Sequence, residues 1–73
     1  MEVSEIGRSL RLPRKRLGVT QTDAAELADI LERTVRDIEK GKDSPSFAAY
    51  AELAHVVGMW IEVAVRSRVH GFA

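Results

Sequence analysis

The sequence predicts an all-α protein of four to five short helices followed by one C-terminal β-strand. Three observations favour this fold class. Apolar residues recur at helical spacing over most of the first 57 residues. Glycines at positions 18, 41 and 58 each follow such a segment, at the place where a helix ordinarily stops. Beyond Gly58 the pattern changes to strict alternation, which is typical of a strand.

The composition fits one small globular domain. The chain has 73 residues, of which 45% are hydrophobic and 30% charged. A domain of this size buries only roughly 60% of its unfolded surface, so a dimer is expected. No apolar run approaches the ~18 residues of a membrane span, and the N-terminus lacks the apolar core of a signal peptide. We therefore expect a soluble, cytoplasmic protein with no membrane partner.

Catalytic and metal chemistry are not predicted. There is no cysteine, so neither a disulfide nor a thiolate metal site can form. His55 and His70 lack metal-ligand spacing to another histidine. The sequence also shows no catalytic pair and no glycine-rich phosphate loop. We predict that the protein is not an enzyme, binds no metal and needs no cofactor.

The first helix is expected from about Ser4 to Leu17, with Ser4 as its N-cap and Gly18 as its C-terminal stop. Pro13 interrupts this segment. Its nitrogen cannot donate to the carbonyl of Ser9, and its ring disfavours helical dihedrals in the residue before it. The sequence therefore predicts a kink at Pro13, or a helix in two pieces.

Residues 20–40 predict two short helices joined by a tight turn, which is a helix-turn-helix unit. Thr20 is a suitable N-cap for the first of these helices, and Asp23 is placed to complete a capping box. The turn allows two interpretations. Asp29 either adopts left-handed dihedrals, or it caps the next helix with Glu32 closing an Asp-x-x-Glu box.

The last helix and the strand follow a loop over residues 41–46. Ser46 can cap a helix that begins at Phe47 and ends near Gly58. A lone strand in a helical domain leaves both edges unpaired, so we expect it to pair with the same strand of a second copy. The predicted dimer interface comprises Met59, Trp60, Ile61, Val63 and Val65.

These elements predict one main domain with two short extensions. The helix-turn-helix domain would span residues 1–58, with the unit itself at about 20–40. A dimerisation strand would occupy residues 59–67, and residues 68–73 have no pattern, which predicts a flexible tail.

The central segment resembles the Xre/Cro family of prokaryotic and phage DNA-binding regulators. The resemblance rests on Thr20-Gln21, on Ala24-Ala25, on a run from Arg33 to Gly41, and on Pro45-Ser46. It implies a lambda-repressor-like domain that binds double-stranded DNA. The chain length and the terminal strand also resemble the Hip-type antitoxins, a branch of that family whose C-terminal strand pairs across a dimer.

The resemblance implies base contacts from the second helix of the unit. Arg33 matches a base-reading position, and a guanidinium can donate to both O6 and N7 of guanine. Glu32 could accept from a cytosine amino group or exclude other bases by repulsion. The alternative is that these charges are only solvated. The full set of candidate base contacts is Leu31, Glu32, Arg33, Arg36 and Asp37.

Other positions are implied to hold the DNA backbone or the fold. Gln21 matches a phosphate-contacting glutamine at a helix start, and Thr34 and Lys42 are further phosphate candidates. Arg14 and Glu39 occupy positions that commonly form an ion pair in the family, so we expect them to be structural.

The formal net charge of zero predicts modest non-specific affinity for DNA. The leading functional hypothesis is a repressor that binds an inverted-repeat operator as a homodimer. In its most specific form it is an antitoxin-like autorepressor that also binds a toxin protein. The alternatives are a phage or host regulator without a toxin, and a protein-interaction module that has lost DNA binding.

Overall fold

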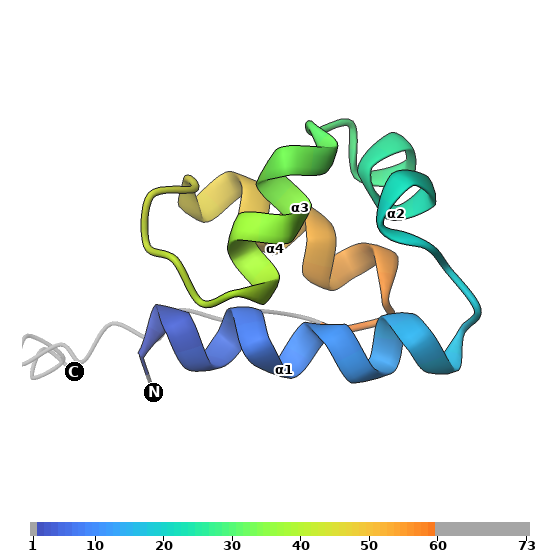
Figure 1. Ribbon diagram of the computed structural model, residues 1–73, viewed down its shortest axis with the longest axis horizontal. Coiled ribbons are helices and arrows are strands. Elements are labelled where there is room, and N and C mark those ends of the chain that lie inside the picture. The colour runs from blue at the N-terminus through green and yellow to red at the C-terminus, as the bar shows by residue number, and fades with distance from the viewer. Residues whose placement is uncertain (1, 60–73) are drawn as a thin grey trace, which may run out of the picture.

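A computed structural model describes residues 2–59 as a bundle of four helices (Figure 1). The helices are α1 (Val3–Arg16), α2 (Gln21–Ala28), α3 (Glu32–Glu39) and α4 (Phe47–Val56). Within residues 2–59 there is no strand, and the all-helical prediction is confirmed for this part of the chain. The predicted strand beyond Met59 and the predicted tail lie outside the described residues.

The three shorter helices lie on one side of α1, and all four contribute to a single core (Figure 1). The largest fully buried side chains are Leu10, Val35, Ile38, Tyr50 and Leu53. Burying side chains of this kind stabilises a fold by roughly 1.5–3 kcal/mol each. α2 and α4 face the core with alanines, which allow the backbones of neighbouring helices to approach closely: Ala24, Ala25, Ala28, Ala49 and Ala54.

Gly7 lies where α1 crosses α3, and the sequence patterns did not indicate its role. A β-carbon at this position would lie 2.0 Å from the backbone oxygen of Ile38 and 3.1 Å from Cε1 of Tyr50. The first of these distances is far inside van der Waals contact. Only glycine therefore allows α1 to pack this closely against the C-terminal half of α3.

Each helix ends with a left-handed residue and the same pair of hydrogen bonds. Gly18, Gly41 and Gly58 have φ of 73°, 81° and 77°, and Asp29 has φ of 57°. At the end of α1, for example, the Val19 N–H donates to the Arg14 carbonyl at 3.2 Å. This pattern satisfies carbonyls that a helix end would otherwise leave without a donor.

The turn after α2 therefore follows the first of the two interpretations. Asp29 is left-handed, and its N–H donates to the Glu26 carbonyl. The second interpretation is wrong, because the N-cap of α3 is Leu31 and no side chain caps that helix. An Asp tolerates left-handed dihedrals better than most residues, which explains how the turn closes without glycine.

The predicted caps of α2 and α4 are confirmed. Thr20 accepts from the Asp23 N–H at 3.0 Å within a complete capping box, and Ser46 accepts from the Ala49 N–H at 3.1 Å. The predicted cap of α1 is wrong. This helix begins at Val3 with Glu2 as its N-cap, so Ser4 already lies inside the helix.

The prediction of a first helix in two pieces is also wrong. α1 runs unbroken through Pro13 to Arg16, and Figure 1 shows no sharp bend in its ribbon. Leu10 on one side of Pro13 and Arg14 on the other are both buried against the same core. This packing fixes both halves of the helix, so the loss of one hydrogen bond does not open a hinge.

Candidate nucleic-acid interface

The helix-turn-helix unit presents one face of α3 to solvent. Val35 and Ile38 point inward and are fully buried, which turns the opposite side of the helix outward. The exposed positions of α3 and its N-cap hold four of the five predicted base-contacting residues: Leu31, Glu32, Arg33 and Arg36. The fifth, Asp37, is half-buried.

Leu31 and Arg33 lie at the exposed start of α3. Leu31 is 71% exposed, so its side chain is accessible at the start of the helix. Arg33 is exposed, and among the described residues it forms no ion pair or side-chain hydrogen bond. A leucine can contact a thymine methyl group, and an unpaired guanidinium can address guanine.

Glu32 and Arg36 contact each other one helical turn apart. The Arg36 Nη1 lies 3.0 Å from Glu32 Oε2, and both side chains are 45% exposed. The other oxygen of Glu32 accepts from the Thr22 hydroxyl of α2 at 3.1 Å. Thr22 was not among the predicted residues, because its contact depends on how α2 and α3 pack.

Asp37 and Lys42 also form an ion pair, with Lys42 Nζ 3.4 Å from Asp37 Oδ1. A predicted base contact and a predicted phosphate contact therefore neutralise each other when no DNA is bound. Lys42 is 56% exposed on its side chain, so its ammonium can exchange partners at little cost. Thr34 is the phosphate candidate that lies on α3, and it is half-buried.

Gln21 opens α2 and is half-buried. Its amide Nε2 donates to Glu39 Oε1 at 3.1 Å, so Glu39 orients the side chain. The capping box occupies the N–H of Asp23, whereas the N–H groups of Gln21 and Thr22 have no partner within the helix. Such groups at a helix N-terminus suit a phosphate oxygen.

Arg14 and Glu39 form a buried ion pair between α1 and α3. Arg14 Nε lies 2.5 Å from Glu39 Oε2, and Nη2 lies 3.0 Å from Oε1. Arg14 Nη1 also donates to the Val19 carbonyl at 2.7 Å. The two side chains are only 7% and 4% exposed, so Arg14 cannot contact DNA. Removing one partner would leave a buried charge, at a cost of about 3–5 kcal/mol.

Tyr50 anchors the loop that carries Lys42. Its hydroxyl donates to the Lys42 carbonyl, although its ring lies in the core. Burial raises the pKa of Tyr50, and the negative charge of Asp43 raises it further. The apolar pattern predicted the buried position of the ring but not this hydrogen bond.

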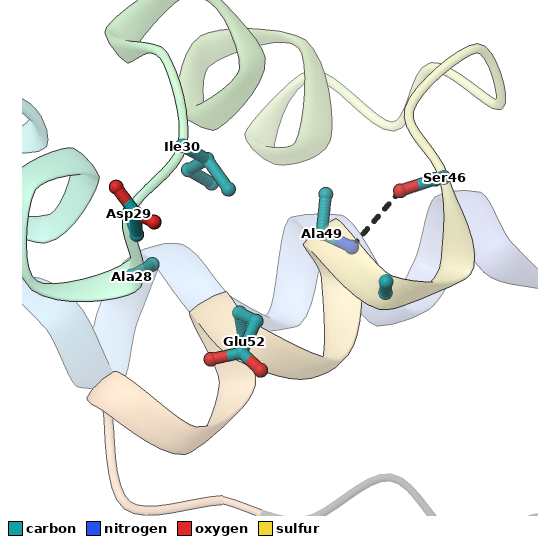
Figure 2. A pocket seen from close by; sticks show the side chains of 7 residues that line it. Ala28, Asp29, Ile30, Ser46, Ala49 and Glu52 are labelled. Carbon is teal, nitrogen blue, oxygen red and sulfur yellow. Dashed lines mark hydrogen bonds between the residues drawn. The ribbon is translucent and has the colours of Figure 1, made fainter.

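One surface hollow has a volume of about 400 Å³ and opens between the end of α2 and the start of α4 (Figure 2). Its rim includes Asp29, Ser46 and Glu52, and the Ser46 hydroxyl is engaged in capping α4. Within residues 2–59 no group of three His, Asp or Glu side chains could hold a metal ion. No helix there is long and apolar enough to cross a membrane.

In DNA-binding helix-turn-helix proteins the second helix of the unit lies in the major groove, and its N-terminal residues contact base edges. The exposed face of α3 has the position of that second helix. The chain belongs to the helix-turn-helix domain family, whose model matches residues 5–68. A helix-turn-helix domain suggests a DNA-binding regulator, and domains of this family are typically non-enzymatic. Comparison with curated proteins gives no match.

Proposed function

We propose that this protein is a sequence-specific transcriptional repressor that binds an inverted-repeat operator as a homodimer. The observation that carries the proposal is Arg33, which is exposed at the start of the outward-facing helix α3 and has no partner among the described residues. An arginine in this position is available to a base without first breaking an internal ion pair.

In the proposed complex α3 lies in the major groove. Arg33 donates two hydrogen bonds to one guanine, and Leu31 contacts a neighbouring thymine methyl group. Gln21, Thr34 and Lys42 contact phosphates and so set the register of the protein on the duplex. Every group in this mechanism is a protein side chain or backbone amide, so no cofactor takes part.

The homodimer follows from the alternating apolar pattern that begins at Met59. Pairing of that segment between two copies would place two α3 helices in successive major-groove segments, about 34 Å apart. Two-fold symmetry of the protein then requires an inverted repeat in the DNA. A dimer bound over a promoter would block transcription by occupying the site. The protein would act in the cytoplasm, at the nucleoid when it is bound to DNA.

The most specific form of the proposal is an antitoxin-like autorepressor. It is supported by the resemblance to the Xre/Cro family and to its Hip-type branch, and the partner would be a cognate toxin protein. A stand-alone phage or host regulator has the same DNA-binding mechanism without that partner.

A second candidate function is a protein-interaction module that has lost DNA binding. It is favoured by the net charge of zero and by the ion pairs Glu32–Arg36 and Asp37–Lys42 on the helix-turn-helix unit. These pairs reduce the positive charge that a DNA phosphate would meet.

The decisive experiment is a binding titration of the full chain with duplex DNA. The duplexes would be the sequence upstream of its own gene, a sequence selected from a random pool, and a scrambled control. A repressor binds the first two more tightly than the scrambled duplex and weakens as salt increases. Equal, weak binding to all three duplexes would favour the interaction module. A toxin that co-purifies with the native protein would distinguish the antitoxin from the stand-alone regulator.

A further inference from the structure

Glu32 connects the two helices of the helix-turn-helix unit through its two carboxylate oxygens. Oε1 accepts from the Thr22 hydroxyl at 3.1 Å, and Oε2 accepts from Arg36 Nη1 at 3.0 Å. Thr22 lies in the first turn of α2, whereas Arg36 lies one turn along α3 from Glu32. The carboxylate is thus held from one helix and in turn holds a guanidinium on the other.

We propose that Glu32 is a positioning residue, which orients Arg36 toward the bases and contacts no base itself. This inference rests on the proposed function, because it concerns how the same helix distinguishes one DNA sequence from another. It also revises the expectation that Glu32 reads cytosine directly.

The argument begins with the flexibility of arginine. A free arginine side chain carries about 2 kcal/mol of rotamer entropy, and it can swing to the phosphates of any sequence. The pairing of Nη1 with Glu32 favours rotamers that keep the Arg36 guanidinium on the outward face of α3. The remaining N–H groups of the guanidinium can still donate, because arginine has five.

Charge supports the same role. Glu32 partly cancels the positive charge of Arg36, so the pair attracts phosphates less than a lone arginine would. An oriented arginine with a reduced net charge discriminates between bases while adding little affinity for random DNA. Arg33 lies on the same helix and has no such partner among the described residues, so it can be compared directly with the paired Arg36.

The test is a double-mutant cycle that measures discrimination. Its members are the wild type, Glu32→Gln, Arg36→Ala and the double variant, each titrated with a duplex selected by the wild type and with a scrambled duplex. The measured quantity is the discrimination ratio, which is the dissociation constant for the scrambled duplex divided by that for the selected duplex. Both side chains are 45% exposed, so the variants should fold, and circular dichroism checks that they do.

We expect Arg36→Ala to lower the ratio by roughly 5- to 150-fold, the usual range for one good bidentate contact. Glu32→Gln should lower the ratio by roughly two- to fivefold, which is the most that an exposed ion pair supports, chiefly through tighter binding to the scrambled duplex. In the Arg36→Ala background the same change should leave the ratio unaltered, because Glu32 then has no arginine to orient.

Three further variants separate this role from a general effect of charge or of stability. Glu26→Gln removes one exposed carboxylate from α2, which has no ion pair among the described residues, and should leave the ratio unchanged. Thr22→Val removes the hydroxyl that holds Glu32 and should lower the ratio. Thr22→Ser keeps the hydroxyl and should restore it.

Two results would overturn this inference alone and leave the proposed function standing. If Glu32→Gln lowers the ratio equally with and without Arg36, Glu32 contacts a base directly. If the ratio is unchanged by Glu32→Gln in the wild-type background, Glu32 is only a surface charge. A wild-type protein that fails to discriminate any duplex would instead overturn the proposed function, and this inference with it.

Discussion

At the residue scale, Gly7 and Tyr50 help to fix the position of α3 and of the loop after it. Gly7 allows close approach of α1 to the Ile38 carbonyl, and Tyr50 fixes the loop after α3 through the Lys42 carbonyl. Neither residue lies on the exposed face of α3. Both nevertheless determine where that face points, so changes there should affect DNA binding through the fold.

Gly7→Ala should destabilise the protein. The new β-carbon would lie 2.0 Å from the Ile38 oxygen, and a backbone atom cannot move aside as a flexible side chain can. Overpacking costs roughly 1–3 kcal/mol, and a 2.0 Å contact with a backbone atom belongs at the upper end of that range. This cost exceeds the ~1 kcal/mol that alanine gains over glycine in a helix. Urea unfolding measures the change. Ser9→Ala, on the exposed side of the same helix, is the control and should shift stability by less than ~0.5 kcal/mol. An unchanged or raised stability for Gly7→Ala would mean that α1 sits further from α3.

Tyr50 should make the fold sensitive to alkaline pH. The pKa of the folded phenol is raised above its ordinary value of 10.0, by burial and then by Asp43. The folded state therefore holds this proton more tightly than the unfolded state. Its contribution to stability is complete below about pH 10 and is lost as the pH rises beyond it. Unfolding from about pH 8 to about pH 11 should show a steeper loss for the wild type than for Tyr50→Phe. Parallel curves would show that Tyr50 does not titrate as the structure indicates.

At the element scale, several helix ends were predictable from sequence because they depend on local chemistry, although the predicted Ser4 cap of α1 was wrong. Thr20 and Ser46 were identified as caps, and Gly18 as a helix stop, from residue types within one turn. Contacts between elements were not predictable in this way. The close approach at Gly7 and the Thr22–Glu32 hydrogen bond depend on how helices far apart in sequence cross.

Pro13 also shows that local sequence rules do not account for contacts between helices. Local rules predicted a kink at Pro13 or a helix in two pieces, but burial on both sides of the proline keeps α1 continuous. The candidate DNA-contacting residues were found by family resemblance. That resemblance indicated which residues face outward, but not that Glu32 pairs with Arg36 or Asp37 with Lys42.

Pro13→Ala should stabilise the protein by up to ~3 kcal/mol, because the helix is already formed there and alanine restores an N–H donor for the Ser9 carbonyl. Thermal unfolding measures the gain in stability. The substitution should leave DNA binding unchanged, because Arg14 still pairs with Glu39. Stability that is equal to or lower than that of the wild type would indicate that the packing around Pro13 is fitted to its ring.

At the scale of the whole molecule, the proposal requires two copies. Removal of residues 60–73 deletes the alternating segment and leaves Met59, whose N–H completes the end of α4. We expect the full chain to sediment as a dimer and the shortened chain to sediment as a folded monomer with much weaker operator binding. A shortened chain that remains a stable dimer would place the interface on the helical bundle instead.

The central claim is that α3 distinguishes DNA sequences, and Arg33 tests it most directly. The matched control is Arg16→Ala, because Arg16 is exposed on α1 and points away from the buried Arg14 two positions earlier. Each protein is titrated with the selected operator and with scrambled DNA at several salt concentrations. Arg33→Ala should weaken operator binding by roughly 1–3 kcal/mol and scrambled binding far less, while Arg16→Ala leaves the difference between the two unchanged. Equal weakening of both duplexes by Arg33→Ala would make Arg33 a phosphate contact and contradict the claim that it reads a base.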